Sequence, residues 1–355
     1  PIALCNAGAA STKLRYYFDR HQKLDPALLL KPDQSPELSY VLPGTVLADY
    51  SSNLFDRQGS IYNIFGEIIP NENVDATVAD EKAGQNVDFD PQRNAFIARR
   101  TGYPYLDKAG RICILDKLLI NDPGQVQSPL RSPLSVVIDC NLQGLEIQAQ
   151  GVLVIKGDVD NCRLSSEAEI SILGNCTGSV LTAKQSITIK GDIINCDEKG
   201  INSGGDLGCN CIRNSLVLCR GCLNLSGQVS GSRIVAEKGI NGDPEQSCVA
   251  NSHVQSSGNI ELGSLGDVDG GETELEITIS PYYKSILMNL TKEMIRVKAD
   301  ASASGEQIEQ LKTEIQACES ELDYQLNTFL KRPREERISI RIHHDLHPVA
   351  NIRIL

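Results

Sequence analysis

Residues 147–159 read IQAQGVLVIKGDV, residues 164–176 read LSSEAEISILGNC, and residues 181–193 read LTAKQSITIKGDI. Aligned at a spacing of 17, the three stretches carry apolar or small side chains at almost every second position. Alternation with period two is typical of β-strands, and recurrence at a fixed interval indicates a repeat architecture. The three stretches therefore predict successive, similar coils of one β-structure.

The same pattern continues on both sides of these stretches. The intervals between successive registers are 17, 17, 17, 20, 16, 17 and 20 residues. The two longer intervals contain the polar loops Asp197–Gly200 and Asn241–Pro244, which have the composition of turns. The eight registers begin at Leu130, Ile147, Leu164, Leu181, Ile201, Val217, Ile234 and Val254.

A stacked solenoid explains this repeat, because one coil cannot bury its own inward face. Intervals near 17, rather than multiples of six, favour a right-handed parallel β-helix over a left-handed hexapeptide helix. Glycine recurs at 157, 174, 191 and 227, which predicts a corner where the backbone turns tightly. We expect the β-helix to occupy residues 126–280.

The period of the apolar residues changes after residue 280. Apolar residues then recur at alternating spacings of 4 and 3, with a break at Ser302–Gly305, and Pro333 marks a stop. This pattern predicts an antiparallel coiled-coil hairpin over residues 281–332. Alternation returns at Ile338–Ile342 and Ile352–Ile354, so residues 333–355 are expected to form β-strands that return to cap the β-helix.

The region before the repeat has a different sequence pattern. Short β-prone runs at Leu14–Phe18, Thr45–Ala48, Ile61–Phe65 and Ile112–Leu115 lie between turn-forming residues. We expect residues 1–125 to form a small β-rich domain.

Composition limits the function classes. The chain carries 34 Lys and Arg against 46 Asp and Glu, a formal net charge of −12, which disfavours a nucleic-acid partner. No apolar run approaches the length of a membrane span. Twelve Cys in a long chain suit a reducing compartment, so we expect a cytoplasmic protein. Tyr and Phe all lie outside residues 106–281, as a core of stacked aliphatic side chains allows.

Five short segments occur in a specific order: Gly44–Ala48, Gly59 with Ile64–Pro70, Ala83–Val87, Asp107–Ile112 and Ile155–Val159. In this order they resemble the flagellar assembly protein A family, over roughly residues 40–355. The resemblance implies a β-solenoid followed by a coiled-coil hairpin in a cytoplasmic bacterial protein linked to flagellar assembly. It implies protein partners, among flagellar assembly or sugar phosphotransferase components, and brings no catalytic residue and no cofactor. The high Cys content departs from the family pattern.

Four of the cysteines form a candidate metal site. Cys209, Cys211, Cys219 and Cys222 lie within 14 residues, and four thiolates can hold zinc tetrahedrally. The repeat places two of them, 209 and 219, inward on different coils, where Cys behaves as a small apolar residue, whereas 222 should point outward. Both interpretations stay open. Asn-Cys pairs at 161–162, 175–176, 195–196 and 210–211 indicate one ladder along a corner.

Acidic and histidine clusters allow other chemistry. Asp158, Asn175 and Asp192 form a column, which suits either calcium in a polysaccharide-processing β-helix or simple turn chemistry. Two Asp two coils apart are about 9.6 Å from each other, near the upper limit for an inverting glycosidase pair. The segment His343–His347 suits either a metal site or a polar turn.

Three functions follow from these patterns. The first is a non-enzymatic scaffold or adaptor in flagellar assembly, with the hairpin either docking partners or capping the rod. The second is a polysaccharide-processing enzyme, and the third is a self-polymerising scaffold, so a homo-oligomer stays open. The residues expected to contact partners are Leu287, Leu290, Met294, Leu311, Ile315 and Leu322.

Overall fold

A computed structural model of the chain describes residues 13–19, 40–51, 61–62, 68–69, 81–196, 200–267, 271–299, 304–331 and 338–354. The chain divides into two compact units. One comprises residues 1–118 and 133–135, and the other comprises residues 119–132 and 136–355.

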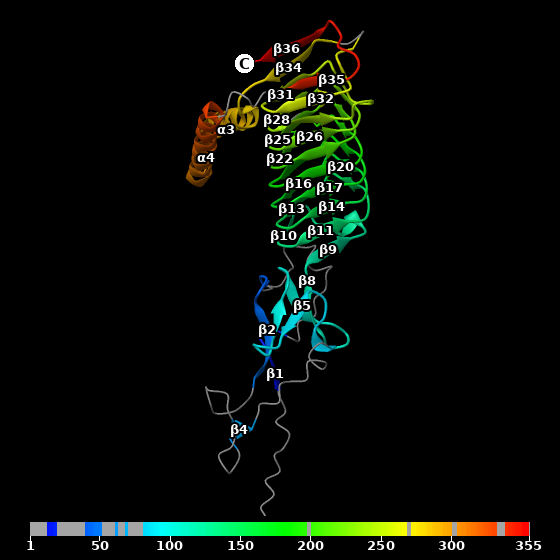
Figure 1. The fold of residues 1–355 in the computed structure, drawn as a ribbon. Coiled ribbons are helices and arrows are strands. Elements are labelled where there is room, and N and C mark those ends of the chain that lie inside the picture. The colour runs from blue at the N-terminus through cyan, green and yellow to red at the C-terminus, as the bar shows by residue number, and fades with distance from the viewer. Residues whose placement is uncertain are drawn as a thin grey trace, which may run out of the picture. The chain divides into compact units, whose positions relative to one another are not determined.

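The second unit contains a parallel β-solenoid, as the repeat predicts (Figure 1). Ile147 pairs with Leu164, and Leu164 pairs with Leu181, so residues 17 apart lie over one another in neighbouring coils. Leu181 then pairs with Ile201 across the first polar loop, whose residues 197–199 lie outside the described part. The insertion therefore leaves the coil register intact.

Each coil contributes strands to three sheets, which we call the first, second and third sheet in chain order. The first sheet comprises β10 (Leu130–Ser132), β13 (Glu146–Ala149), β16 (Arg163–Ser166), β19 (Val180–Ala183), β22 (Ile201–Ser203), β25 (Leu216–Cys219), β28 (Arg233–Ala236), β31 (His253–Ser256), β34 (Thr273–Ile277) and β36 (Ala350–Ile354). The second sheet comprises β9 (Lys117–Ile120), β11 (Ser135–Ile138), β14 (Leu153–Ile155), β17 (Ile170–Ile172), β20 (Ile187–Ile189), β23 (Leu207–Cys209), β26 (Cys222–Leu225), β29 (Gly239–Gly242), β32 (Asn259–Leu262) and β35 (Ile340–Ile342). The third sheet comprises β12 (Leu142–Gln143), β15 (Val159–Asp160), β18 (Cys176–Thr177), β21 (Ile193–Ile194), β24 (Ile212–Arg213), β27 (Gln228–Ser230), β30 (Cys248–Ala250) and β33 (Ser264–Leu265).

Aliphatic columns fill the interior of the solenoid. Ile155, Ile172 and Ile189 pair in register along the second sheet, and each is at most 1% exposed. Burying each of these side chains contributes roughly 2 kcal/mol of transfer free energy. The three faces of one coil approach closely enough for Ile, Leu and Val to fill the space, which explains why no aromatic residue is needed there.

One corner of every coil depends on a left-handed backbone. Between the third and the first sheet, Asn161, Asn195 and Asn251 have φ values of 51°, 54° and 46°. Gly178 and Gly231 take the same place in other coils, with φ values of 55° and 60°. Asn and Gly are the residues that tolerate this conformation best.

The recurrent glycines lie at a corner, as the sequence predicts. Gly157, Gly174, Gly191 and Gly227 lie in the bends that connect the second sheet to the third, although none of them has a positive φ. A Cβ atom on Gly174 or Gly191 would lie 2.7 Å from a backbone oxygen of the preceding coil. These glycines therefore permit close stacking between coils.

Two helices near the C-terminus form a helical hairpin, α3 (Pro281–Ala299) and α4 (Gly305–Leu330). A capping box starts α4: the Ser304 hydroxyl accepts the Gln307 N–H at 3.2 Å, and the Gln307 side chain accepts the Ser304 N–H at 3.2 Å. Residues 302–303 of the predicted break lie outside the described part.

The chain then returns to the solenoid. Ile340 of β35 pairs with Ile260 of β32, and Ile352 of β36 pairs with Leu275 of β34, both in parallel. The two strands are the last members of their sheets at that end. Pro333, the predicted helix stop, lies outside the described residues.

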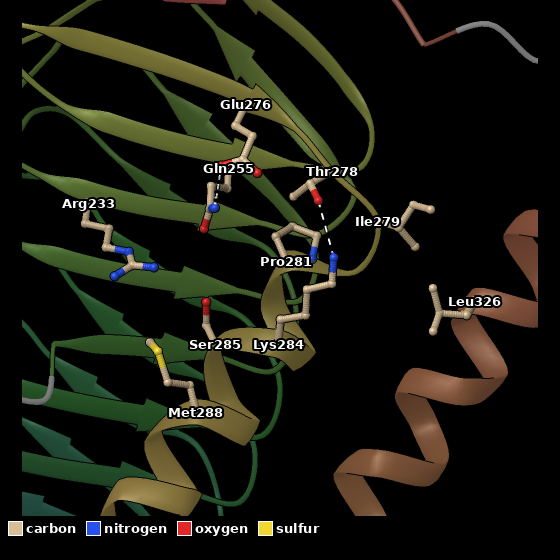
Figure 2. Close-up of a pocket in the computed structure, with 10 residues that line it drawn as sticks. All are labelled: Arg233, Gln255, Glu276, Thr278, Ile279, Pro281, Lys284, Ser285, Met288 and Leu326. Atoms are coloured by element: carbon tan, nitrogen blue, oxygen red, sulfur yellow. Dashed lines mark hydrogen bonds between the residues drawn. The ribbon is translucent and has the colours of Figure 1, made fainter. Parts of the chain in front are cut away.

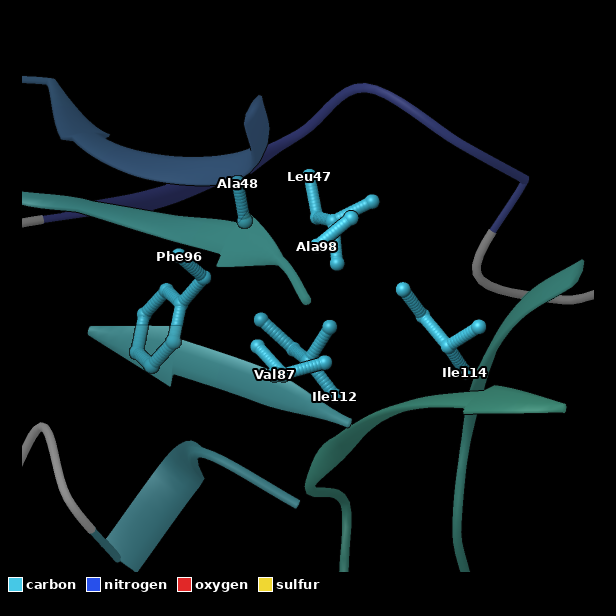
Figure 3. Packing of buried hydrophobic residues seen from close by; sticks show 7 residues of the cluster. All are labelled: Leu47, Ala48, Val87, Phe96, Ala98, Ile112 and Ile114. Atoms are coloured by element: carbon cyan, nitrogen blue, oxygen red, sulfur yellow. The ribbon is translucent and has the colours of Figure 1, made fainter. Parts of the chain in front are cut away.

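The first unit is built on a small antiparallel sheet. Its core packs residues from three of the strands with Ile112 and Ile114, and Phe96 is fully buried (Figure 3). Of the predicted run Ile61–Phe65 only the first two residues are described, and Gly59, Ile64–Glu67 and Pro70 of the family motif also lie outside. The sheet order is β1 (Lys13–Tyr16), β2 (Val46–Ser51), β6 (Ala95–Ala98) and β5 (Val87–Asp90), with separate pairs β3 (Ile61–Tyr62) with β4 (Ile68–Ile69) and β7 (Tyr103–Leu106) with β8 (Ile112–Leu115).

Candidate functional site

The outward face of the first sheet changes character at the coils where the hairpin docks. Successive outward positions pair in register from coil to coil. Most are polar, but Leu218 and Val235 are apolar and only 3% and 0% exposed, because the hairpin covers them. The full column is Gln148, Ser165, Thr182, Asn202, Leu218, Val235, Gln255 and Glu276.

The first turn of α3 is held by solenoid side chains. Tyr282 is buried on Leu218 and Val235, and its hydroxyl donates to the Asn202 side chain at 2.9 Å. The Tyr282 backbone N–H donates to the Glu237 carboxylate at 3.0 Å, which satisfies a free donor of the helix N-terminus with a favourable charge. Burial raises the pKa of Glu237, and the hydrogen bond from Tyr282 opposes this rise.

Arg220 joins the solenoid to both helices. Its guanidinium lies 5.4 Å from the ring centre of Tyr283 in α3 and 3.5 Å from the Glu321 carboxylate in α4. The rings of Tyr282 and Tyr283 pack edge to face with centres 5.3 Å apart, and the Cys318 thiol donates to the Tyr283 carbonyl at 3.4 Å. A buried aromatic pair and one cation thus anchor the base of the hairpin.

All six residues expected to contact partners are at least half-buried in the hairpin. Met294 is 7% exposed, and the remaining five are half-buried. Three of them, Leu287, Leu290 and Leu322, pack on the anchoring cluster, whereas Leu311 and Ile315 lie farther along α4. Partner binding through the six stays a prediction. The apolar side chains that the hairpin does expose are Met288, Ile295, Tyr324 and Leu330.

Two hollows lie between α3 and the outward face of the first sheet. One of about 400 Å³ is lined by residues of β28, β31, β34, α3 and Leu326 of α4 (Figure 2). A second of about 450 Å³ is lined by the β25 side of the same face and by α3. Arg233, Ser285 and Met288 line both hollows, so the two adjoin.

The cysteines do not assemble into a metal site. Among the described residues no three His, Cys, Asp or Glu side chains are grouped so that they could hold a metal ion. Cys209 and Cys219 are buried, as the register predicts. Cys222, which the register predicts to point outward, is half-buried, and Cys211 is buried as well. Burial raises the pKa of Cys209 and of Cys219, so both thiols are protonated at neutral pH.

The acidic column is a hydrogen-bonded ladder. The Asp158 carboxylate accepts the Asn175 N–H at 2.7 Å, and the Asn175 side-chain oxygen accepts the Asp192 N–H at 2.9 Å. Asn210 donates its side-chain N–H to Asp192 at 2.7 Å. These carboxylates satisfy backbone donors of the next coil, which favours the interpretation as turn chemistry.

The Asn-Cys pairs belong to two corners rather than the single ladder that the sequence predicts. Pairs 175–176 and 210–211 lie on the acidic ladder, whereas 161–162 and 195–196 follow the third sheet. There the Cys162 N–H donates to the Ser179 hydroxyl at 3.0 Å, and the Ser179 N–H donates to the Cys196 sulfur at 3.4 Å. Cys and Ser thus alternate as small acceptors along one corner.

The histidine segment lies at the returning end. His343 is 2.7 Å from the Glu261 carboxylate, and His344 is 3.3 Å from that of Glu245. The hydrogen bond with His343 holds the pKa of Glu261 below its ordinary value. These contacts are pairwise surface contacts, and the segment belongs to no metal-binding group of the described residues.

Comparison with known proteins places this architecture in a family. No helix of the described part is long and apolar enough to cross a membrane. Neither curated proteins nor solved structures give a match. A family model described as the Flagellar Assembly Protein A beta solenoid domain matches residues 142–354, from β12 through the hairpin to β36. This chain therefore belongs to the flagellar assembly protein A family.

Proposed function

We propose that this chain is a non-enzymatic cytoplasmic scaffold in bacterial flagellar assembly, and that its docked hairpin is the element that engages protein partners. The family points to a role related to flagellar assembly and is not known to be enzymatic. The observation that carries the proposal is the apolar patch of Leu218 and Val235, on which the hairpin is fixed by the buried Tyr282. A helix pair held rigidly on a stiff solenoid loses little entropy on binding a partner.

The two other functions have less support. The carboxylates of the acidic column, Asp158 and Asp192, are already engaged by backbone N–H groups of the next coil, so they are not poised as an acid–base pair. Strands β35 and β36 occupy the end of their sheets, where an end-to-end polymer would have to add its next strand. Neither arrangement favours a polysaccharide enzyme or a self-polymerising filament.

A genetic replacement tests the role of the docked hairpin. The gene is deleted in the source organism, and flagella are counted by electron microscopy after return of the wild type, Leu218→Asp or Thr182→Asp. Position 182 lies in the same outward column and its side chain is exposed, so it is the matched control. We expect the wild type and the control to restore flagella and Leu218→Asp to fail, because a buried carboxylate releases the hairpin. Unchanged flagellation after deletion would refute the flagellar role, and full rescue by Leu218→Asp would refute the role of the docked hairpin.

A further inference from the structure

The two adjoining hollows form one groove, which we call the α3 groove. Its floor is the outward face of the first sheet, and its wall is the side of α3 that carries Lys284, Ser285, Met288 and Lys292. We call the hollow of about 400 Å³ the upper hollow and that of about 450 Å³ the lower hollow. Figure 2 shows the upper hollow, with Arg233 on the sheet side and Met288 and Lys284 on the helix side. The volumes of about 400 and about 450 Å³ each lie in the range of ligand-binding clefts, and the two hollows adjoin.

Three cations line the α3 groove without a carboxylate partner among the described residues. Arg233, Lys284 and Lys292 are exposed and make no ion pair there, and Lys284 only contacts the Thr278 hydroxyl at 3.4 Å. One carboxylate lines the groove, Glu276, and it already accepts from Gln255 at 2.7 Å.

Several other cations of this unit are paired with acids, whereas Arg131, Arg163 and Lys190 make no ion pair among the described residues. Lys156 lies 2.7 Å from Asp139, and Arg213 lies 3.4 Å from Asp192. Lys184 pairs with Glu167 in the same way. On a chain with a net charge of −12, acidic partners for cations are abundant. A groove lined by three cations and one carboxylate therefore has a local positive charge that attracts an external anion.

The groove also offers apolar surface. Met288 is 38% exposed at the junction of the hollows, and Leu326 lines the upper hollow from α4. Leu216 lines the lower hollow beside Lys292. Met is unbranched and adapts to different apolar side chains, which suits a docking surface. A ligand that satisfies both features carries carboxylates and apolar side chains together.

We propose that the α3 groove binds an acidic, apolar-anchored segment of a protein partner, with its Asp and Glu side chains on Arg233, Lys284 and Lys292 and an apolar side chain against Met288. The groove proposal adds a binding site to the proposed function, and the biological identity of the partner rests on that function. The helix α4 of a second copy is a competing occupant, because α4 is itself acidic.

Fluorescence anisotropy of a defined probe tests the groove on the full chain. The probe is a fluorescein-labelled peptide of repeated Glu-Glu-Leu-Leu blocks, and its counterpart has Lys in place of Glu. Because the net charge is −12, unspecific attraction favours the Lys peptide, so preference for the Glu peptide reports a local cationic site. We expect the wild type to prefer the Glu peptide and to lose this binding as salt concentration rises.

A charge-matched pair of variants locates the binding. The groove variant combines Arg233→Glu, Lys284→Glu and Lys292→Glu, and the control combines Arg131→Glu, Arg163→Glu and Lys190→Glu, which are exposed and outside the groove. The groove variant should weaken binding of the Glu peptide roughly tenfold or more relative to the control. A second groove variant has Gln at the three positions, which removes the positive charges without adding negative charges that could disturb the fold. It should also weaken binding of the Glu peptide.

The outcomes separate cleanly. Equal binding by the groove variant and the control, or a preference for the Lys peptide, overturns the proposal. Sedimentation velocity without peptide adds one more outcome: a wild-type dimer that the groove variant alone dissociates would assign the groove to a second copy and overturn the partner segment. If the wild type binds the Glu peptide through the groove but deletion of the gene leaves flagellation unchanged, the groove proposal stands and the proposed function is refuted.

Discussion

Two pairs of neighbouring coils have the same backbone fold but differ on the outward face of the first sheet. One pair contains β16 and β19, and the other contains β25 and β28. All four strands place apolar or small side chains inward, in register. Outward, the first pair presents Ser165 and Thr182, and the second pair presents Leu218 and Val235. Only the second pair carries helices.

This difference shows that the two faces of a strand have separate structural roles. The inward face maintains the stack and varies little, because each side chain must fit between those of the coils on either side. The outward face is free of that restraint, so apolar side chains there can contribute to docking another element. In this solenoid the docking of the hairpin therefore depends on outward positions.

Removal of an inward side chain should have the largest effect. Ile172→Ala leaves a cavity in a fully buried column, and we expect the free energy of unfolding to fall by about 3 kcal/mol. Ser171→Ala, at the neighbouring outward position of β17, should change it by less than about 0.5 kcal/mol. Urea unfolding followed by circular dichroism measures both. A similar loss for the two variants would erase the distinction between the faces.

The inward face was predictable from sequence because its rule is local and repeated. Residues 17 apart, such as Ile155 and Ile172, must occupy equivalent places if coils stack, and the pairing confirms this register. The Asn corner at 161 and 195 was visible as a pattern, but its division into two ladders depends on which corner each residue turns. That assignment needs the strand ends, which period alone does not give.

The docking site was not predicted, although its signal is in the sequence. Leu218 and Val235 break the alternation of β25 and β28 in consecutive coils, and an apolar residue at outward parity indicates a covered face. Which element covers that face could not be deduced, because the contacts of Tyr282 are more than 40 residues distant along the chain. The groove cations were missed for the same reason.

A change at the docking site should have a smaller, local effect. Leu218→Asp places a carboxylate under Tyr282, and we expect the hairpin to lose about 2 kcal/mol of docking free energy while the solenoid stays folded. Hydrogen exchange measured by mass spectrometry should show faster exchange in α3 and α4 and unchanged exchange in β13–β19. Thr182→Asp is the control and should leave both regions protected. Faster exchange throughout the solenoid would contradict a separable hairpin.

The smallest effect concerns pH at the base of α3. Burial raises the pKa of Glu237 above its ordinary value of 4.5, so the folded state binds this proton more tightly than the unfolded state. Its stabilising contribution is therefore full below pH 4.5 and is lost as the pH rises through the raised pKa. Glu237→Gln stays neutral at every pH and removes this dependence.

The variant should consequently gain stability relative to the wild type as the pH rises from 4.5 towards 8, by about 1 kcal/mol or less. The gain stays small because the ionised carboxylate keeps its hydrogen bond from the Tyr282 N–H at the positive end of α3. Urea unfolding at several pH values, with the exposed Glu169→Gln as control, measures the difference. If Glu237→Gln instead lost stability relative to the wild type with rising pH, the ionised carboxylate would stabilise the helix by more than its burial costs, and the base of the hairpin would be held by charge rather than by the aromatic pair.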